Sequence, residues 1–580
     1  MQSICGSLVY PHLVKLGLER GAAKPYYRRF LPINIAQRKR PIMKKLIQAS
    51  LVGMASLTSL SMAASTHTAI NTCSGTYPSY WQDIAPKFAD MWKGQDISNA
   101  PTGAYSGPIF KLADDYPRQA VDDKANQAWR SAKFDAMFNP ATSQDIKAAL
   151  AKEYAWLVYN YALAGNINQK EQTDFDVCKN PVRPWYHIAF QTYDPLSGRE
   201  FVHGLTREAP VTFSIKSGVG TASTTMWAVA IYNATAAYTL GKVWQKDGTA
   251  KVPSTNIRFD EGSVIAKPLF NTATVDQLPV LANMPMWNAN ISDPSFCVTP
   301  DDSTIVDQAK LCPRNYAKWN DVKLMQFDIS IADSRAPGTG WVYGTFVADG
   351  RRKARVNDAW QRVSLLGLMW GNDTPPQGQY AYNYPVDPRK NGFKEEVIFW
   401  DVVDELNSFG GTGMVQRMWH LGSNHRLNGP ADNANSSCIS CHGSASVPDS
   451  TFTTPPLLAQ FSGMTKQSVA LVTGLKTQGL DRSGAVATVN NGVSFSEMDA
   501  IYFANVMAGT SFNMTTPSGK NVMGEGVPSY PNTAQKNWIS LDYSLQLSMS
   551  LKQWMQWQAD EKAQTPVQNR KFVKALRRAQ

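Results

Sequence analysis

The residues with the clearest chemical potential are two cysteines and a histidine within five consecutive positions. Cys438-Ile439-Ser440-Cys441-His442 has the C-x-x-C-H spacing of covalent c-type haem attachment. That spacing suits the chemistry because two thiols must reach the two vinyl groups on one edge of the macrocycle, while the adjacent imidazole turns under the iron. We therefore predict Cys438 and Cys441 as the thioether anchors of one haem c and His442 as its proximal iron ligand.

Two other functions of this motif were weighed against haem attachment. A thioredoxin-like redox pair requires a βαβ setting, which the surrounding sequence does not have. A zinc site requires a second Cys/His pair nearby, and none follows. The motif occurs once, which argues against two-haem peroxidases and multihaem electron wires.

The sixth coordination position of the iron stays open at this stage. A Met or His there would give an electron carrier, whereas an empty position would admit small molecules to the iron. His420 and His425 precede the motif, and His187 and His203 lie further upstream; each is more often a polar or structural residue than a ligand. Met residues on helical stripes are usually core residues. The candidates after the motif are Met464, Met498, Met507, Met514, Met523, Met549 and Met555.

The N-terminal residues predict export. Met43-Lys44-Lys45 precedes an apolar run at 46–60 and the small residues 61–64, which is the order of a secretory signal peptide with cleavage near Ala64. We interpret residues 1–42 as the result of a start codon assigned too early, with Met43 as the expected start. The run is too short for a spanning helix, and no later stretch reaches about 18 apolar residues. We expect a periplasmic protein without a membrane span in its mature chain.

The leader also accounts for the positive charge of the chain. The full sequence has 57 Lys+Arg and 46 Asp+Glu, a net charge of +11, which suggests an anionic partner. Residues 1–64 contain ten basic residues and one acidic residue, so residues 65–580 carry only +2. We therefore predict no nucleic-acid partner. The expected partner is a redox protein or a small molecule.

Four cysteines remain outside both the leader and the haem motif. In an oxidising compartment isolated cysteines tend to pair. Cys297 with Cys312 would close a short loop, which leaves Cys73 with Cys178 as the other pair. Proximity and elimination predict these two disulfides; the alternative, one or more buried thiols, stays open.

The periodicity of apolar residues predicts an α+β fold. Ile146, Leu150, Tyr154, Leu157 and Tyr161 recur at helical spacing, which predicts a helix from Ser143 to a stop at Gly165. From 181 to 400 the period changes to two, as expected for an antiparallel β-domain. Its strand candidates are 226–232, 263–270, 325–331, 341–347 and 363–370.

This pattern divides the chain into four regions. The first is the leader, residues 1–64, with the signal peptide at 43–64. A mostly helical N-terminal region at 65–180 and the β-rich domain at 181–400 follow. Residues 401–580 hold a loop-rich haem-attachment segment and a helical tail. In that tail Leu547, Leu551, Trp554 and Met555 form one apolar stripe.

Beyond c-type cytochromes in general, four short islands resemble the β-sheet cytochromes, which are cytochrome c′-beta and its hydroxylamine-oxidising relatives with a lysine cross-linked to haem. That family has a strand of the form F-x-D-G-T-V-x-V-K, a second strand, a Trp-containing strand and the haem motif. Residues 258–267, 325–333, 340–346 and 437–445 resemble these in order. About 90 residues separate the last two islands here, where the family has a short loop.

The resemblance implies a role for Lys267, which falls at the position of the cross-linking lysine. Lys267 shares strand parity with Ile265 and Leu269. The alternative is that Pro268 marks a strand end and Lys267 extends to solvent. The expected function is an exported monohaem c-type cytochrome that transfers electrons. A haem oxidoreductase with an open distal site, acting on a small nitrogen or oxygen species, and a haem-based gas-binding protein remain alternatives.

Overall fold

The computed structural model describes the middle of the chain most fully. The described residues are 115–167, 175–177, 180–189, 205–214, 221–246, 249–289, 320–354, 356–373, 389, 392–408, 421–422, 425–432, 437–443, 445–448, 488–489, 493–494 and 538–562. All of them belong to the unit Ala69–Gln580, which is distinct from Gln2–Thr68. The predicted leader therefore lies outside the described residues, as do Cys73, Cys178, Cys297 and Cys312.

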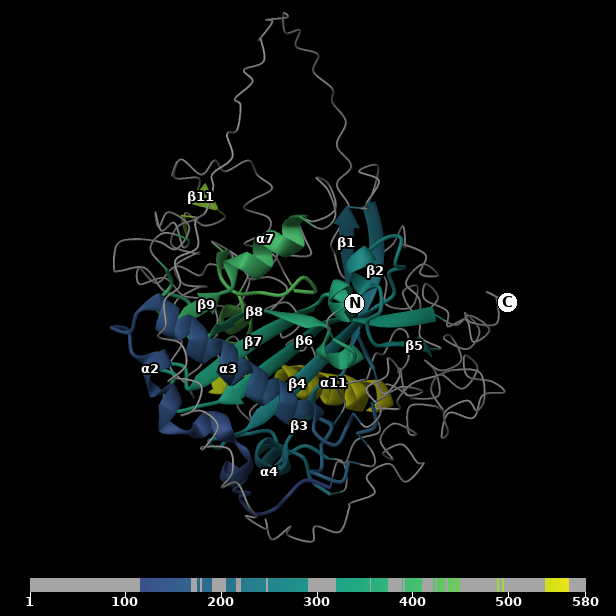
Figure 1. The fold of residues 1–580 in the computed structure, drawn as a ribbon. Helices are drawn as coiled ribbons and strands as arrows, with labels where there is room; N and C mark the ends of the chain where they lie inside the picture. Colours follow the sequence, from purple (N-terminus) through teal and green to yellow (C-terminus); the bar gives the residue numbers. More distant parts are fainter. Residues whose placement is uncertain are drawn as a thin grey trace, which may run out of the picture. The chain divides into compact units, whose positions relative to one another are not determined.

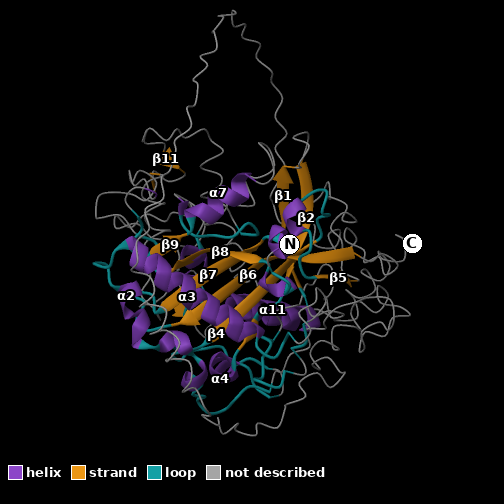
Figure 2. Cartoon of the chain, in the orientation of Figure 1, coloured by secondary structure: helices purple, strands orange, loops and turns teal. Residues whose placement is uncertain are grey.

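One antiparallel sheet organises the described part of the chain (Figures 1 and 2). Its nine strands run in the order β1-β2-β4-β6-β7-β8-β9, with β3 paired to β4 and β5 to β6. Their bounds are β1 Thr206–Ser214, β2 Thr221–Ala228, β3 Ile231–Tyr232, β4 Val264–Asn271, β5 Met286–Ala289, β6 Asn320–Ala332, β7 Trp341–Ala348, β8 Val363–Met369 and β9 Glu396–Ile398. The predicted strands at 263–270, 341–347 and 363–370 coincide with β4, β7 and β8, and the one at 325–331 lies within β6. The predicted run 226–232 is divided into the end of β2 and the short β3, and β1, β5 and β9 were not predicted.

Helices precede and follow the sheet. The α-helices are α2 Asp135–Phe138, α3 Gln144–Leu163, α4 Ala234–Val243, α7 Trp400–Ser408, α8 Cys438–Gly443 and α11 Leu545–Lys562. The 3-10 turns are η1 Lys124–Asn126, η2 Ala128–Arg130, η3 Ala132–Phe134, η4 Pro279–Leu281, η6 Gly350–Ala354 and η7 Ala359–Gln361. Short ladders pair β10 Ser446–Pro448 with β13 Trp538–Ser540 and β11 Thr488–Val489 with β12 Val493–Ser494. The predicted α+β class, with helices before and after a central antiparallel sheet, is confirmed.

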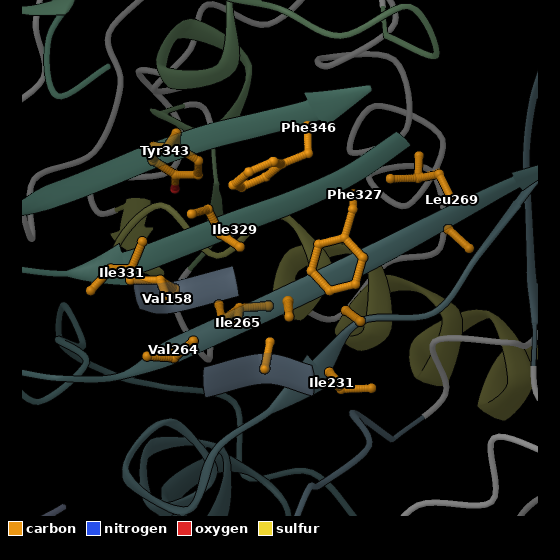
Figure 3. Packing of buried hydrophobic residues seen from close by; sticks show 14 of the residues in the cluster. Val158, Ile231, Val264, Ile265, Leu269, Phe327, Ile329, Ile331, Tyr343 and Phe346 are labelled. Atoms are coloured by element: carbon orange, nitrogen blue, oxygen red, sulfur yellow. The ribbon is translucent and has the colours of Figure 1, made fainter. Parts of the chain in front are cut away.

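Helix α3 covers one face of the sheet. It follows Ser143, and Gly165 after its C-terminus has a φ of +80°, a conformation that favours glycine, as the sequence predicted. The Tyr159 ring lies 4.8 Å from Phe327 of β6 and 4.6 Å from Phe346 of β7, between ring centroids. Figure 3 shows Val158, Phe327, Ile329, Ile331 and Phe346 among the packed side chains.

The buried face of α3 differs from the predicted one. Tyr154 and Tyr161 are buried as expected, but Ile146 is 53% exposed. The face that meets the sheet combines Val158 with the aromatic residues Trp156 and Tyr159, which pack on Phe327 and Phe346. The sequence pattern was therefore right about the helix and wrong about its first apolar position.

Pro268 lies inside β4 instead of ending it. Its carbonyl accepts a hydrogen bond from the Val229 amide. Val229 follows β2 and precedes β3, the two strands that pair with this side of β4. The backbone N and O atoms of a residue in an antiparallel strand point toward the same neighbouring strand. The position at which Pro268 lacks an N–H therefore faces the gap between β2 and β3. Strand β4 therefore continues past Lys267, which pairs across the ladder with Asp328 of β6.

The apolar stripe predicted for the tail lies on α11. Leu547 and Leu551 are fully buried, Trp554 is 8% exposed, and Met555 packs against the same core. The Trp554 ring lies 6.2 Å from that of Trp244, just after α4. Within the described ranges, no helix is both long enough and apolar enough to span a bilayer.

The packing of α3 gives a test within one helix. Val158→Ala should lower the free energy of unfolding by about 2 kcal/mol, because it removes two fully buried carbons and leaves a small void. Ile146→Ala, at the exposed position, should change it by less than about 0.5 kcal/mol. Urea unfolding of both variants measures the difference, and equal losses would contradict the packing described here.

Candidate functional site

The haem motif forms its own short helix, α8. Ser437 precedes it: its Oγ accepts from the Ser440 amide at 3.1 Å, and its carbonyl accepts from the Cys441 amide. The Ser437 hydroxyl also donates to Asn372 Oδ1 at 2.6 Å. The Cys438 amide donates to the Leu427 carbonyl at 3.2 Å. Helix α8 is thus fixed at its N-terminus by residues that are remote in sequence.

The His442 imidazole is held by one backbone carbonyl. Its Nδ1 lies 2.9 Å from the oxygen of Tyr543, and its ring centroid lies 4.7 Å from that of Tyr343 on β7. Burial lowers the pKa of His442 to about 4. The hydrogen bond to the Tyr543 carbonyl opposes this by raising the pKa, and the charge of Lys267 lowers it further. At neutral pH the ring is therefore neutral. Because a carbonyl only accepts, Nδ1 carries the proton and Nε2 keeps its lone pair.

An unusual turn presents that carbonyl. Asp542 and Tyr543 have φ values of +50° and +64°, which non-glycine residues rarely adopt. The Asp542 amide donates to Ser540 Oγ, and its Oδ2 accepts from the Phe259 amide at 2.7 Å. The Tyr343 hydroxyl also donates to the Tyr543 carbonyl, at 3.3 Å. This turn therefore positions a ligand-orienting oxygen beside the motif.

The two motif cysteines are partly buried thiols that do not form a disulfide. Burial raises the pKa of the Cys438 thiol well above its usual range, and the charges of Asp432 and Asp328 add to this. The Thr345 side chain is a hydrogen-bond partner of Cys438. A thioredoxin-like pair needs a lowered thiol pKa, so this environment disfavours that alternative.

A polar row on the sheet faces the motif. Lys267, Asp328 and Thr345 are direct cross-strand partners on β4, β6 and β7, so their side chains share one face. Thr345 Oγ1 donates to Asp328 Oδ1 at 3.0 Å. Lys267 is only partly buried and acts electrostatically on both Asp328 and His442. The structure thus brings Lys267 to the motif's side of the sheet.

Gln326 fixes the loop before α8 to this row. Its amide nitrogen donates to Asp328 and, at 2.9 Å, to Asp432 Oδ2, while its oxygen accepts from the Ala431 amide. A Cβ on Gly429 would lie 2.1 Å from the Gln326 amide, so glycine is needed there. Burial raises the pKa of Asp328 to about 8, and the charge of Asp432 contributes.

A second buried acid supports the loop from the sheet edge. Glu396 of β9 is fully buried, and its Oε2 accepts from the Leu427 amide at 2.7 Å. Burial raises the pKa of Glu396 well above its usual range, and the charge of Asp373 adds to this. Burial also raises the pKa of Asp373 to about 6. Leu427 therefore links a protonated carboxyl to the first residue of α8.

Four of the other predicted candidates lie in the described part of the chain, and none of them takes part in the contacts of the motif given above; two are on α11, a helix that contacts α8. His425 is exposed, with its ring 6.0 Å from that of Trp400, and His187 is buried beside the bridge Tyr186–Tyr232. Met549 and Met555 lie on α11. Among the described residues, no group of three or more His, Cys, Asp or Glu could hold a metal ion. Candidates outside the described residues are His203, His420, Met464, Met498, Met507, Met514 and Met523.

The residues present fit a covalently attached haem. Two thiols that are not joined in a disulfide lie one helical turn apart, and the following imidazole has its Nδ1 proton donated to a carbonyl, which is the usual orientation device for a metal-ligating His. The sequence did not reveal Tyr543, Asp328 or Glu396. For Asp328 and Glu396 the one available signal was an acidic residue inside a strand, β6 and β9 respectively.

Comparisons of the chain with protein-family models, with curated proteins and with solved structures give no match in any of the three. The chemistry of the site therefore rests on its own residues.

Glu396 gives a test of the network around α8. Its carboxyl stays protonated in the folded chain but ionises near its ordinary pKa in the unfolded chain. Its contribution to stability is therefore full below about pH 4.3 and falls by about 1.4 kcal/mol per pH unit as pH rises, until the folded carboxyl ionises. Glu396→Gln stays neutral at every pH, and its side-chain oxygen can still accept from the Leu427 amide. The loss of stability with rising pH should therefore be absent in this variant.

Chemical unfolding of the parent chain and of Glu396→Gln between pH 4 and pH 8 measures the effect, as the difference between their free energies of unfolding at each pH. Glu405→Gln, which alters an exposed residue of α7, is the matched control. A constant difference between Glu396→Gln and the parent at every pH would contradict a protonated buried carboxyl.

Proposed function

We propose that this chain is an exported monohaem c-type cytochrome whose function is electron transfer. Cys438 and Cys441 bind haem c covalently, and His442 is the proximal ligand. Haem c supplies a one-electron iron couple when bound. The proposed location is the periplasm, since haem c is assembled outside the cytoplasm and a signal peptide is predicted at 43–64.

The observation that carries this proposal is the hydrogen bond between His442 Nδ1 and the Tyr543 carbonyl. It fixes the tautomer in which Nε2 is available to iron, next to two thiols that have not paired with each other. A merely structural histidine has no need of the strained turn at Asp542 and Tyr543.

A second candidate is a haem oxidoreductase with an open distal site, acting on a small nitrogen or oxygen species. The polar row formed by Lys267, Asp328 and Thr345 favours it, because an electron carrier has no need of a lysine and a protonated carboxyl beside its macrocycle. This candidate also agrees with the resemblance to the β-sheet cytochromes, in which the position of Lys267 corresponds to the cross-linking lysine.

Covalent attachment is the direct test of the proposed function. Expressed with a cytochrome c maturation system, the denatured chain should carry the added mass of one haem, because thioether bonds survive unfolding. Replacing both Cys438 and Cys441 by alanine should abolish haem staining on denaturing gels. Cys297→Ala should keep it, and a denatured parent chain without the added mass would refute the proposal.

The spectrum of the iron separates the two candidates. An electron carrier with a sixth protein ligand should be low-spin in the ferric state and indifferent to cyanide, whereas an open site should be high-spin and bind cyanide or nitric oxide readily. If the site is open, Lys267→Ala should shift the visible spectrum without releasing haem. Lys251→Ala, at an exposed loop residue, should leave it unchanged. A low-spin, unresponsive ferric spectrum would eliminate the open site.

A further inference from the structure

A cavity of about 150 Å³ lies on the sheet face opposite the haem motif. Trp156 of α3 lines it and packs on Phe346 of β7, 5.0 Å between ring centroids. Phe346 belongs to the α3 face of the sheet, whereas Tyr343, which contacts His442, belongs to the other. The cavity is therefore separate from the proposed haem site.

The walls of this cavity are mainly apolar. Besides Trp156 they include Leu365 of β8, Phe399 before α7 and Val402 on α7. An apolar cavity of about 150 Å³ in another protein is large enough to bind benzene. A ligand the size of one six-membered ring would therefore fill this space.

One cation on the wall lacks the partner that its burial requires. Arg352 of η6 has a buried Nε with no hydrogen-bond partner among the described residues, and its guanidinium carbon lies 6.0 Å from the Trp156 ring centroid. A buried donor without a hydrogen-bond partner is unfavourable. The adjacent Arg351 differs, since it pairs with Asp349 at 2.7 Å and with Glu405 at 3.6 Å. Of these two adjacent arginines, Arg352 is thus the one left to pair with a bound anion.

The remaining polar lining defines the charge of the ligand. Lys152 is an exposed cation without an ion pair in the described part of the chain, and Asp401 is an exposed anion. The Ser364 hydroxyl already donates to Asp349 Oδ2 at 3.1 Å. Two cations and one anion line the cavity, so the lining favours a negative group beside Arg352.

We propose that this cavity binds a small monocarboxylate with an apolar body of about one ring, its carboxylate paired with Arg352 and its body against Trp156, Leu365 and Val402. This site is independent of the proposed haem function. It would stabilise the contacts between α3, η6 and α7 when filled, because those elements supply its walls.

Isothermal titration of the protein as isolated, with benzoate as the probe, tests the proposal. Benzoate should bind saturably, and benzylamine, which has the same ring and the opposite charge, should not. Arg352→Gln should weaken benzoate binding about tenfold or more, since it removes the charge-assisted hydrogen bonds. Lys353→Gln, which removes a neighbouring exposed charge outside the cavity, should bind as the parent does.

A second variant keeps the test valid if Arg352→Gln folds poorly. Val402→Phe fills the cavity from the partly exposed α7 and leaves Arg352 unchanged, so it should also weaken benzoate binding. Circular dichroism verifies the fold of each variant. The absence of saturable benzoate binding at tens of millimolar, equal binding of benzylamine, or unchanged binding in folded Arg352→Gln or Val402→Phe would each overturn the proposal.

Discussion

The alternation of side chains along β6 is the constraint on which the rest of the structure depends. β6 pairs with β4, β5 and β7, so it lies within the sheet. Phe327, Ile329 and Ile331 are buried, and the Phe327 ring packs against Tyr159 of α3. The opposite face then carries Gln326 and Asp328. Burying these without partners would cost several kcal/mol, on the order of 2–7 for a polar group in an apolar medium. Whatever covers that face must satisfy them.

The loop before α8 meets this requirement. Gln326 uses both its amide nitrogen and its oxygen to bind the loop at Ala431 and Asp432. Helix α8 has only six residues, too few to be stable alone. Its conformation therefore depends on hydrogen bonds from segments remote in sequence, at Asn372, Leu427 and Tyr543. These hydrogen bonds and the burial of Ile439 in the core together hold the haem motif in place.

This dependence explains which features the sequence could predict. The helix after Ser143, the central strands β4, β6, β7 and β8, and the motif itself have local signatures in periodicity and spacing, and these were predicted. The strands β1, β5 and β9 were not. Ile146 was assigned to the core because periodicity does not show which of several apolar arcs meets the sheet. The continuation of β4 through Pro268 was not fixed by the sequence, since it depends on the interruption between β2 and β3. The Asp542–Tyr543 turn has no glycine to mark it.

Burial around the motif disfavours the charged form of each titratable group that it affects. Burial raises the pKa of Asp328 and of Glu396, and lowers the pKa of His442. The Glu396 carboxyl therefore holds its proton at neutral pH, the pKa of Asp328 is shifted in the same direction, and the imidazole is neutral. An imidazole binds a metal only when the ring nitrogen is unprotonated, so protons compete least where burial and a nearby lysine both oppose the imidazolium. The same low polarity that makes Gln326 and Asp328 costly to bury thus prepares Nε2 of His442 as a ligand. The polar row and the orienting carbonyl are two consequences of placing α8 over the sheet.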